Sequence, residues 1–482
     1  MAAGDDALAA SLRVWTHRTP LLQFSSFQSL LTLSEGGVAE IRAFRAYRFN
    51  AATVSSADVT TQPYDKITPA MQERYYAASP FNLIPIEKGR ILPGDSSETN
   101  VYTRAAAKLD DWISSGILVK DQVPAIYAYS QEYAVPGTNT RRVRRGFIAL
   151  ARVEDFAAEI VFRHERTLAA PKADRLELLR HTHAQTGLLF MLYDDPSKQI
   201  DSMLEMISRT PATVELKDEY GVIHQLWTIT DAGSIRRITG AMAAQKLIIA
   251  DGHHRYETAL AFRDECRERA REANPDAPYE FAMMALFNTH SSGLTILPTH
   301  RVIRNVANFD FAKFRAQASR YFDWYGYPFS SQDERAGAHE DFLRDLEKQR
   351  VRHAIGVYGG GGAFYLFVLK PNTDFAQILP DVSEAQRELD VVLLHRLLIE
   401  KCLGITAEAV TSEQHISYER DLSAAIAAVD GGEAQLAFLL NPVRVKQVTE
   451  IALGGEVLPQ KSTDFYPKLL SGLVIYRIED RK

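Results

Sequence analysis

The sequence is poor in cysteine, in long apolar runs and in excess positive charge. Among its 482 residues only Cys266 and Cys402 are cysteines, and neither belongs to a Cys-x-x-Cys pair, which excludes a disulfide scaffold and a cysteine-based zinc site. No apolar run approaches the roughly 18 residues that a membrane-spanning helix needs, and the N-terminal residues lack the apolar core of a signal peptide. We therefore expect a cytoplasmic protein that does not enter a membrane.

The formal net charge is −6 at pH 7. A surface that neutralises nucleic-acid phosphates carries an excess of Lys and Arg, so nucleic acid is not an expected partner. With 46% hydrophobic and 24% charged residues, the composition is that of a globular protein. Its length exceeds what one hydrophobic core usually serves, which predicts more than one domain.

One stretch in the middle of the chain predicts a strand, a tight turn and a helix. The apolar run Leu247–Ala250 is typical of a strand that is buried on both faces. The run stops at Asp251 and Gly252, and from Tyr256 onward apolar residues recur at helical spacing. We expect Asp251 to cap this helix and Gly252 to let the backbone turn sharply. The amides after Gly252 would then face outward at a helix N-terminus, which favours anions.

The same turn concentrates side chains that suit phosphate chemistry. Arg255 can grip phosphate oxygens, and the imidazoles of His253 and His254 can donate hydrogen bonds or carry protons. A carboxylate beside a phosphate needs a cation between them, so Asp251 predicts a Mg²⁺ site. The alternative is an ordinary strand-to-helix turn with histidines on its surface.

Three other groups of residues are candidates for a site. Asp65 follows Pro63-Tyr64 and is either a turn cap or a general base. The segment 455–462 misses a phosphate-binding P-loop because Gln460 replaces the last glycine, yet its Lys461 and Ser462, with Lys468, remain candidates for an anion contact. The alternative is a structured loop. The basic cluster at 141–145 is expected to be a solvated, edge-protecting face of a hairpin.

The pattern also predicts elements away from this turn. Pro69–Ala78 is expected to be a helix with proline in its first turn, and 83–86 a strand. The strand predicted at 293–296 should extend the sheet that contains the central strand. Four glycines at 359–362 predict a hairpin between 354–358 and 363–369. Helices are predicted at 333–348 and 389–402.

The residues Ile249–Ala259 resemble the signature of the DUF1015 family of uncharacterised proteins. Asp251-Gly-His-His-Arg255 is similar to the phosphate-binding motif of the ParB/sulfiredoxin superfamily, which includes free-serine kinases, ATP-using sulfiredoxins and CTP-hydrolysing ParB proteins. The resemblance implies that this turn holds the phosphates of a nucleotide such as ATP or ADP, with Mg²⁺. Further stretches that resemble the family are 44–48 with 62–67, 164–168 with 171–175, 296–301, and 458–468.

We thus expect an α+β protein in three parts. These are an N-terminal extension (1–38), a mixed-sheet domain with a ParB/sulfiredoxin-like core that binds a nucleotide (39–305), and a smaller α+β domain (306–482). The resemblance implies a Mg²⁺-dependent phosphotransferase for a small hydroxyl-bearing metabolite such as serine. Asp251 and His253 would act at the phosphates, and Asp65 as base. The alternatives are a nucleotide-switched binding protein of ParB type and a non-catalytic scaffold. On this hypothesis, replacing Arg255 by alanine abolishes nucleotide binding and barely changes the melting temperature of the ligand-free protein.

Overall fold

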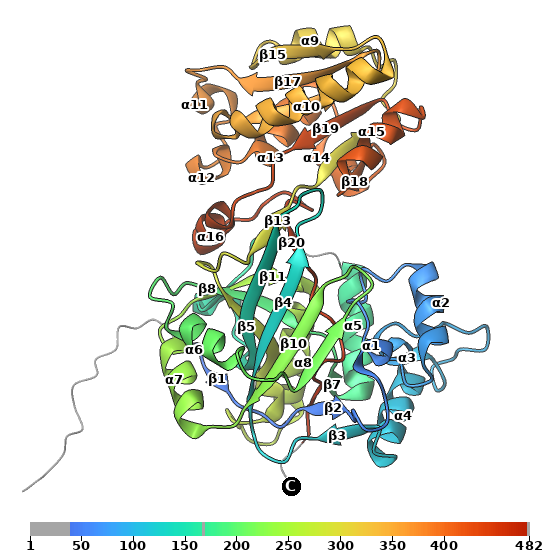
Figure 1. Cartoon of the computed structure of the whole chain (residues 1–482), viewed down its shortest axis with the longest axis vertical. Helices are drawn as coiled ribbons and strands as arrows, with labels where there is room; N and C mark the ends of the chain where they lie inside the picture. Colours follow the sequence, from blue (N-terminus) through green and yellow to red (C-terminus); the bar gives the residue numbers. More distant parts are fainter. Residues whose placement is uncertain (1–38, 166–168, 480–482) are drawn as a thin grey trace, which may run out of the picture. The chain divides into compact units, whose positions relative to one another are not determined.

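The computed structural model describes residues 39–165 and 169–479, so the predicted extension lies outside the described residues. Within them, nine strands form one mixed sheet (Figure 1). β11 pairs in parallel with β6 and antiparallel with β8, whereas β8 and β12 are parallel, so the predicted mixed sheet is confirmed. The strands across the sheet, with β1 (Ile41–Arg42) beside β5, are β6 (Val161–Phe162), β11 (Leu247–Asp251), β8 (Leu189–Tyr193), β12 (Phe281–Asn288), β5 (Arg141–Arg152), β4 (Ile126–Ala134), β10 (Ile223–Ile229) and β9 (Val214–Lys217).

The later part of the chain forms a second, antiparallel sheet of six strands within the described residues. The predicted hairpin across the four glycines is confirmed, because β16 and β17 pair directly. Across this sheet the strands are β15 (Phe322–Pro328), β17 (Ala363–Leu369), β16 (Ala354–Tyr358), β19 (Leu436–Leu440), β14 (His300–Ile303) and β18 (Ile416–Glu419).

Helices of very different length connect these strands. Those within the first 300 residues are α1 (Ser56–Val59), α2 (Pro69–Ala78), α3 (Ile84–Glu87), α4 (Val101–Ser114), α5 (Ala169–Thr182), α6 (Gln199–Ile207), α7 (Ala232–Met242) and α8 (His253–Arg269). The later ones are α9 (Phe311–Ala318), α10 (Gln332–Lys348), α11 (Phe375–Ile378), α12 (Glu384–Arg387), α13 (Asp390–Leu393), which continues as a π-helix (Leu394–Cys402), α14 (Ala407–Thr411), α15 (Leu422–Asp430) and α16 (Val445–Leu453).

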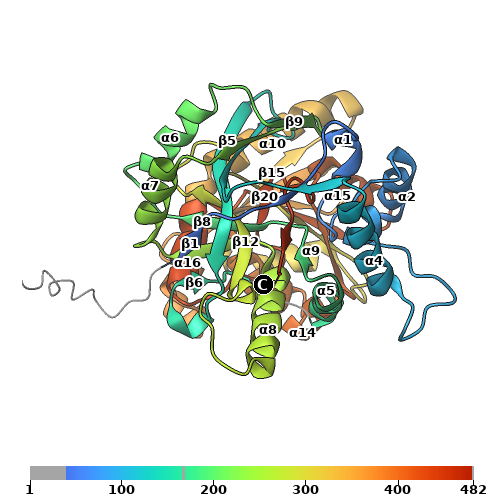
Figure 2. The same ribbon diagram turned by 90° about the horizontal axis from the view of Figure 1, so that it is seen from below.

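Both faces of the nine-stranded sheet are buried, because alternate side chains enter different cores. In β12, Met284 belongs to the core that contains Met203 of α6 and Ile238 of α7, whereas Met283 belongs to the core that contains Leu179 of α5. Figure 2 shows α6 and α7 on one side of these strands and α5 on the other. This burial explains why the central strands are uninterrupted apolar runs in the sequence.

Two local predictions are confirmed and two are wrong. Helix α2 spans the predicted Pro69–Ala78, with Thr68 as its N-cap, and α10 covers the helix predicted at 333–348. The predicted strand at 83–86 is instead the short helix α3, which has proline in its first turn. The strand predicted at 293–296 does not extend the large sheet. It appears as β13 (Thr295–Leu297), which pairs with β20 (Asp464–Tyr466).

The last described strands return to the first part of the chain. Besides the β13–β20 pair, β21 (Tyr476–Arg477) pairs with β7 (Ala184–Gln185), while β2 (Tyr47–Phe49) pairs with β3 (Leu118–Lys120). The six-stranded sheet therefore lies, in sequence, between two segments that pack together.

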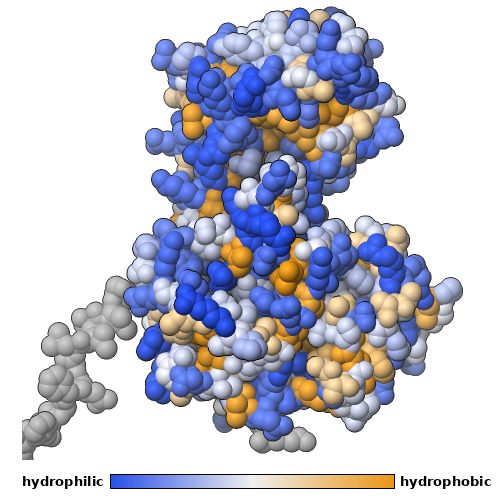
Figure 3. Space-filling view, viewed as in Figure 1, coloured by the Kyte–Doolittle hydropathy of each residue, from blue (hydrophilic) through white to orange (hydrophobic). Residues whose placement is uncertain are grey.

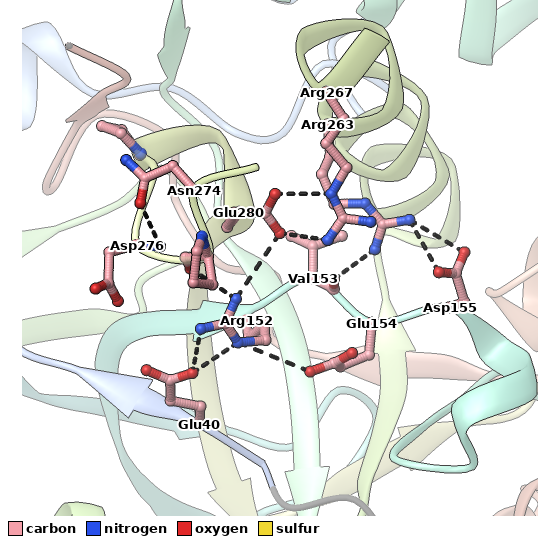
Figure 4. A network of polar contacts seen from close by, with 12 residues as sticks. Glu40, Arg152, Val153, Glu154, Asp155, Arg263, Arg267, Asn274, Asp276 and Glu280 are labelled. Atoms are coloured by element: carbon pink, nitrogen blue, oxygen red, sulfur yellow. Dashed lines mark hydrogen bonds and ion pairs between the residues drawn. The ribbon is translucent and has the colours of Figure 1, made fainter. Parts of the chain in front are cut away.

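A polar network fixes the C-terminal half of α8 (Figure 4). The buried Arg263 donates to the backbone oxygen of Val153 at 2.6 Å and to the carboxylate of Asp155 at 3.1 Å. One turn later, Arg267 donates two hydrogen bonds to the buried carboxylate of Glu280, at 2.7 and 2.5 Å. Paired, charge-assisted contacts of this kind hold a helix in one orientation.

We expect Glu280→Ala to lower the free energy of unfolding by about 1.5 kcal/mol, because the variant loses a two-point hydrogen bond to a charged group. Urea unfolding at pH 7.5 measures this change. Glu268→Ala, at an exposed position of the same helix, serves as the control and should change stability by less than about 0.5 kcal/mol. Equal effects of the two substitutions would contradict a role for this network.

Polar residues cover most of the face drawn in Figure 3, and apolar residues form smaller groups between them. Across residues 39–165 and 169–479, none of the helices combines the length and the apolar character that crossing a bilayer requires.

Candidate functional site

Strand β11 ends in the turn that the sequence singled out. Gly252 has a φ of +92° and is the N-cap of α8. A Cβ at this position would lie 3.3 Å from Cδ2 of Leu189, so both conformation and space favour glycine. Asp251 does not cap the helix as predicted, because its Oδ1 accepts the N–H of Gly252 at 2.9 Å and the N-cap position is occupied by Gly252, which has no side chain. The left-handed turn lets the helix begin at once, at His253.

A cavity of about 560 Å³ adjoins this turn. Its size is within the range of about 300–1,000 Å³ that small-molecule sites occupy. The predicted site residues that line it are Asp65, Asp251, Gly252, His253, His254, Arg255, Lys461 and Lys468. Ser462 is not among them: it lines a separate cavity, and its hydroxyl donates to the backbone oxygen of Pro459. Lining residues that the sequence did not suggest include Lys66, Glu165, Tyr418, Arg420 and Asp464.

Lys468 is the cation that accompanies Asp251 in this structure. Its Nζ lies 2.8 Å from Oδ2 of Asp251 and 3.0 Å from Oδ1 of Asp464. Burial by itself raises the pKa of Asp251. The charge and the hydrogen bond of Lys468 lower this pKa by more than burial raises it, so the pKa of Asp251 lies below its ordinary value. In the part of the chain that the structure describes, no group of three or more His, Cys, Asp or Glu side chains is arranged to hold a metal ion. The Mg²⁺ ion expected beside Asp251 stays a prediction, because one carboxylate can hold Mg²⁺ together with the phosphate oxygens of a bound nucleotide.

Two buried imidazoles lie under the turn. Nδ1 of His164 is 2.8 Å from the backbone oxygen of Ile249, so this nitrogen carries the proton, and Nε2 accepts from the hydroxyl of Thr463 at 2.9 Å. The ring packs edgewise on His253, with centroids 4.8 Å apart. Burial lowers the pKa of His164 to about 4 and the pKa of His253 well below its usual value. Both rings are consequently neutral near pH 7.

His253 keeps one unused hydrogen-bonding atom. Its Nε2 is buried and has no hydrogen-bond partner among the described residues. Buried polar atoms are nearly always paired, and an unpaired one costs about 1–3 kcal/mol. Since His253 lines the cavity, a polar ligand there is one way to meet this requirement.

Arg255 is engaged within the protein. Its guanidinium donates to the backbone oxygen of Leu188 at 3.1 Å, lies 3.5 Å from Oε1 of the buried Glu87, and sits 5.2 Å from the ring centroid of Tyr64. Burial lowers the pKa of Arg255, but the carboxylates of Glu87 and Asp65 more than offset this and raise it. Arg255 therefore joins three segments of the chain besides lining the cavity.

The comparison with family models matches residues 41–392 to DUF1015, described as a protein family of unknown function. The chain belongs to the DUF1015 family. The search of curated proteins finds no match. The DUF1015 chain is similar to solved structures at low identity. One is a conserved hypothetical protein from Pyrococcus furiosus, at 12% identity and a TM-score of 0.30, covering 66% of this chain and 90% of that one.

Free serine kinases are also among the similar structures. One in complex with AMP has 11% identity and a TM-score of 0.32, and a variant in complex with ADP has 11% identity and a TM-score of 0.33. Each alignment covers 69% of the DUF1015 chain and 92% of the other chain. At these TM-scores the likeness carries no argument about the site, which is interpreted below from its own geometry.

Glu165 is a cavity residue that sequence reasoning missed. Its Oε1 accepts the backbone N–H of Lys461 at 2.9 Å, which ties the carboxyl to the loop opposite the turn. Burial raises the pKa of this carboxyl. Asp65, the base predicted from the sequence, is more exposed and lies 3.7 Å from Nζ of Lys66. In the sequence, His164-Glu165 resembles the start of a zinc-protease motif, but the second histidine of that motif is absent. No other local feature of the sequence marks Glu165 as a site residue.

The prediction that the basic cluster at 141–145 forms a solvated face of the β4–β5 hairpin is wrong for Arg144. Arg144 is fully buried and donates to the side chain of Gln131 and to the backbone oxygens of Tyr466 and Pro467. Burial lowers the pKa of Arg144 to about 10. Alternation along β5 points this side chain inward, and its two backbone acceptors, Tyr466 and Pro467, lie more than 300 residues away in sequence.

Proposed function

We propose that this DUF1015 protein is a nucleotide-dependent phosphotransferase that acts on a small hydroxyl-bearing metabolite such as serine. The observation that carries this proposal is the cavity at the N-terminus of α8, lined by Lys461, Lys468 and the neutral His253. A helix N-terminus and ammonium groups favour phosphate oxygens, and a neutral imidazole can donate one further hydrogen bond. The proposal includes a ParB/sulfiredoxin-like core and ATP or ADP as the nucleotide.

The proposed chemistry uses residues on both sides of the cavity. The acceptor hydroxyl transfers its proton to the carboxylate of Glu165 while its oxygen forms a bond to the terminal phosphorus of the nucleotide. The bond from that phosphorus to the bridging oxygen breaks, and the nucleotide leaves one phosphate shorter. Lys461 and the amides of α8 stabilise the charge that spreads over the phosphoryl oxygens. The proposal also includes Mg²⁺ as a cofactor, which Asp251, beside Lys468, would help to hold and which would neutralise charge on the phosphates.

A carboxyl with a raised pKa suits this role, since a base is most effective when its pKa approaches the working pH. We expect Glu165→Gln to lower kcat by about 100-fold and to leave the Kd for ATP unchanged. In the wild type, activity should rise as the pH increases through the raised pKa of Glu165. Asp65→Asn tests the base that the sequence suggested, and Glu205→Gln, an exposed carboxylate on α6, is the control. A 100-fold loss in Asp65→Asn and none in Glu165→Gln would move the base to Asp65.

The first experiment is a thermal-shift screen of nucleotides followed by mass spectrometry of mixtures with hydroxyl-bearing metabolites. A stabilising nucleotide together with a phosphorylated product supports the phosphotransferase. A stabilising nucleotide without a product in any mixture favours the nucleotide-switched binding protein of ParB type. The absence of any shift with every nucleotide, with and without Mg²⁺, favours the scaffold.

A further inference from the structure

The segment Gln460–Lys468 carries two of the three lysines that line the cavity, Lys461 and Lys468, yet most of the segment lies outside regular structure. Only β20 belongs to a strand, and it pairs with three residues of β13. Lys461 has a positive φ of +56°, which is unusual for a residue with a side chain. Contacts from elsewhere must therefore set where the two ammonium groups lie.

Arg301 holds the beginning of this segment. Its Nη2 donates to the backbone oxygens of Gln460 and Lys461, at 3.3 and 3.2 Å. The side chain is fully buried in β14, and its guanidinium lies 5.2 Å from the ring centroid of Tyr418, another cavity residue. Burial lowers the pKa of Arg301 to about 10.

Arg144 holds the end of the segment in the same manner. It donates to the backbone oxygens of Tyr466 and Pro467, next to Lys468. Among the described residues neither Arg144 nor Arg301 forms an ion pair with a carboxylate. A buried guanidinium without a carboxylate is costly, so a purely stabilising role would be met more simply by an apolar residue of similar volume.

The two arginines belong to different sheets, since Arg144 is on β5 of the nine-stranded sheet and Arg301 is on β14 of the six-stranded sheet. We infer that Arg144 and Arg301 are positioning residues that fix the segment Gln460–Lys468 from its two ends, so that Lys461 and Lys468 face the phosphates of the ligand. The forked guanidinium holds carbonyl oxygens of neighbouring residues, which a single ammonium cannot do with the same geometry. The part that concerns phosphates rests on the proposed function; the part that concerns the segment does not.

Hydrogen–deuterium exchange of the ligand-free protein tests the positioning directly. Arg301→Gln removes the charge and the fork, whereas Arg301→Lys keeps the charge alone. We expect exchange of the amides in 460–468 to accelerate by at least about tenfold in Arg301→Gln, and by a smaller factor in Arg301→Lys. Arg144→Lys should accelerate exchange at the other end, around 466–468. Unchanged exchange in all three variants overturns the inference.

Binding of ATP provides the second readout, measured well below the melting temperature of each variant. We expect the Kd for ATP to rise about tenfold in Arg301→Gln and to rise measurably in Arg301→Lys. Arg335→Lys, at an arginine that pairs with Asp430 and does not line the cavity, is the matched control and should bind ATP as the wild type does. Arg301→Lys that matches the wild type in exchange and affinity overturns the positioning role. A wild type that binds no nucleotide overturns the proposed function instead, and the exchange result still decides the inference.

Discussion

Replacing Lys468 by alanine is expected to lower the free energy of unfolding by about 4 kcal/mol and to abolish binding of any phosphate compound in the cavity. The Lys468 side chain is 12% exposed, and its ammonium group lies between the carboxylates of Asp464 and Asp251, whose side chains are 6% and 37% exposed. Its removal leaves two partly or fully buried carboxylates with less positive charge beside them. Breaking a buried ion pair costs about 3–5 kcal/mol. Arg420, 2.7 Å from Asp464, keeps the effect from being larger.

The effect of this substitution should depend on pH. Lys468 lowers the pKa of Asp251, so the pair stabilises the folded state fully above the ordinary carboxyl pKa of about 4 and loses that contribution as the pH falls below it. The difference in stability between wild type and Lys468→Ala should therefore shrink between pH 7.5 and pH 3.5, as measured by urea unfolding. Lys446→Ala, an exposed lysine paired with Glu450, is the control with an expected effect below about 0.5 kcal/mol. A Lys468 variant as stable as this control would contradict the buried pair.

Replacing Arg255 by alanine is expected to lower the free energy of unfolding by about 3 kcal/mol, in contrast to the small change that the sequence alone suggested. The substitution removes the cation beside the buried Glu87 and the donor to Leu188. Among the described residues, the carboxylate of Glu87 would retain only the hydroxyls of Thr186 and Ser471 as hydrogen-bond donors, at 2.6 and 3.0 Å. Chemical denaturation of the ligand-free protein measures the loss.

A double-mutant cycle separates the contact with Glu87 from other effects of removing Arg255. If the carboxylate is what the guanidinium stabilises, the combination with Glu87→Gln should cost less than the sum of the single changes by about 1 kcal/mol or more. Arg163→Ala removes an arginine whose side chain is 46% exposed and serves as the control. An Arg255→Ala protein that keeps its stability and loses only ATP binding would show that the residue serves the ligand alone.

Local patterns in the sequence predicted the turn at the centre of the site and much of its surroundings. An uninterrupted apolar run is typical of a strand that is covered on both faces, and Leu247–Ala250 lies in such a strand. Proline in the first turn marked α2, and four glycines marked the hairpin of β16 and β17. These features depend on neighbours in sequence, which is why they are visible without coordinates. The resemblance to DUF1015 was visible for the same reason, because it rests on contiguous motifs, and the family match confirms it.

The partners of the site residues were not predictable, because they come from distant parts of the chain. Lys468 is 217 residues from Asp251, and Arg144 is 323 residues from the carbonyl of Pro467 that it holds. A charged residue in a hairpin strand suggests solvent unless its distant acceptors are known, so Arg144 was misplaced. In the same way, the sequence does not show that the ammonium group of Lys468 lies beside Asp251.

The pairing of β20 with β13 has a consequence for how the protein is made. Everything that forms the turn at Gly252 leaves the ribosome well before Lys461 and Lys468, which follow the whole six-stranded sheet in sequence. During synthesis Asp251 therefore lacks its partner Lys468 until more than a hundred further residues have been added. The cavity is assembled as a late event, and a nascent chain cannot hold a ligand there prematurely.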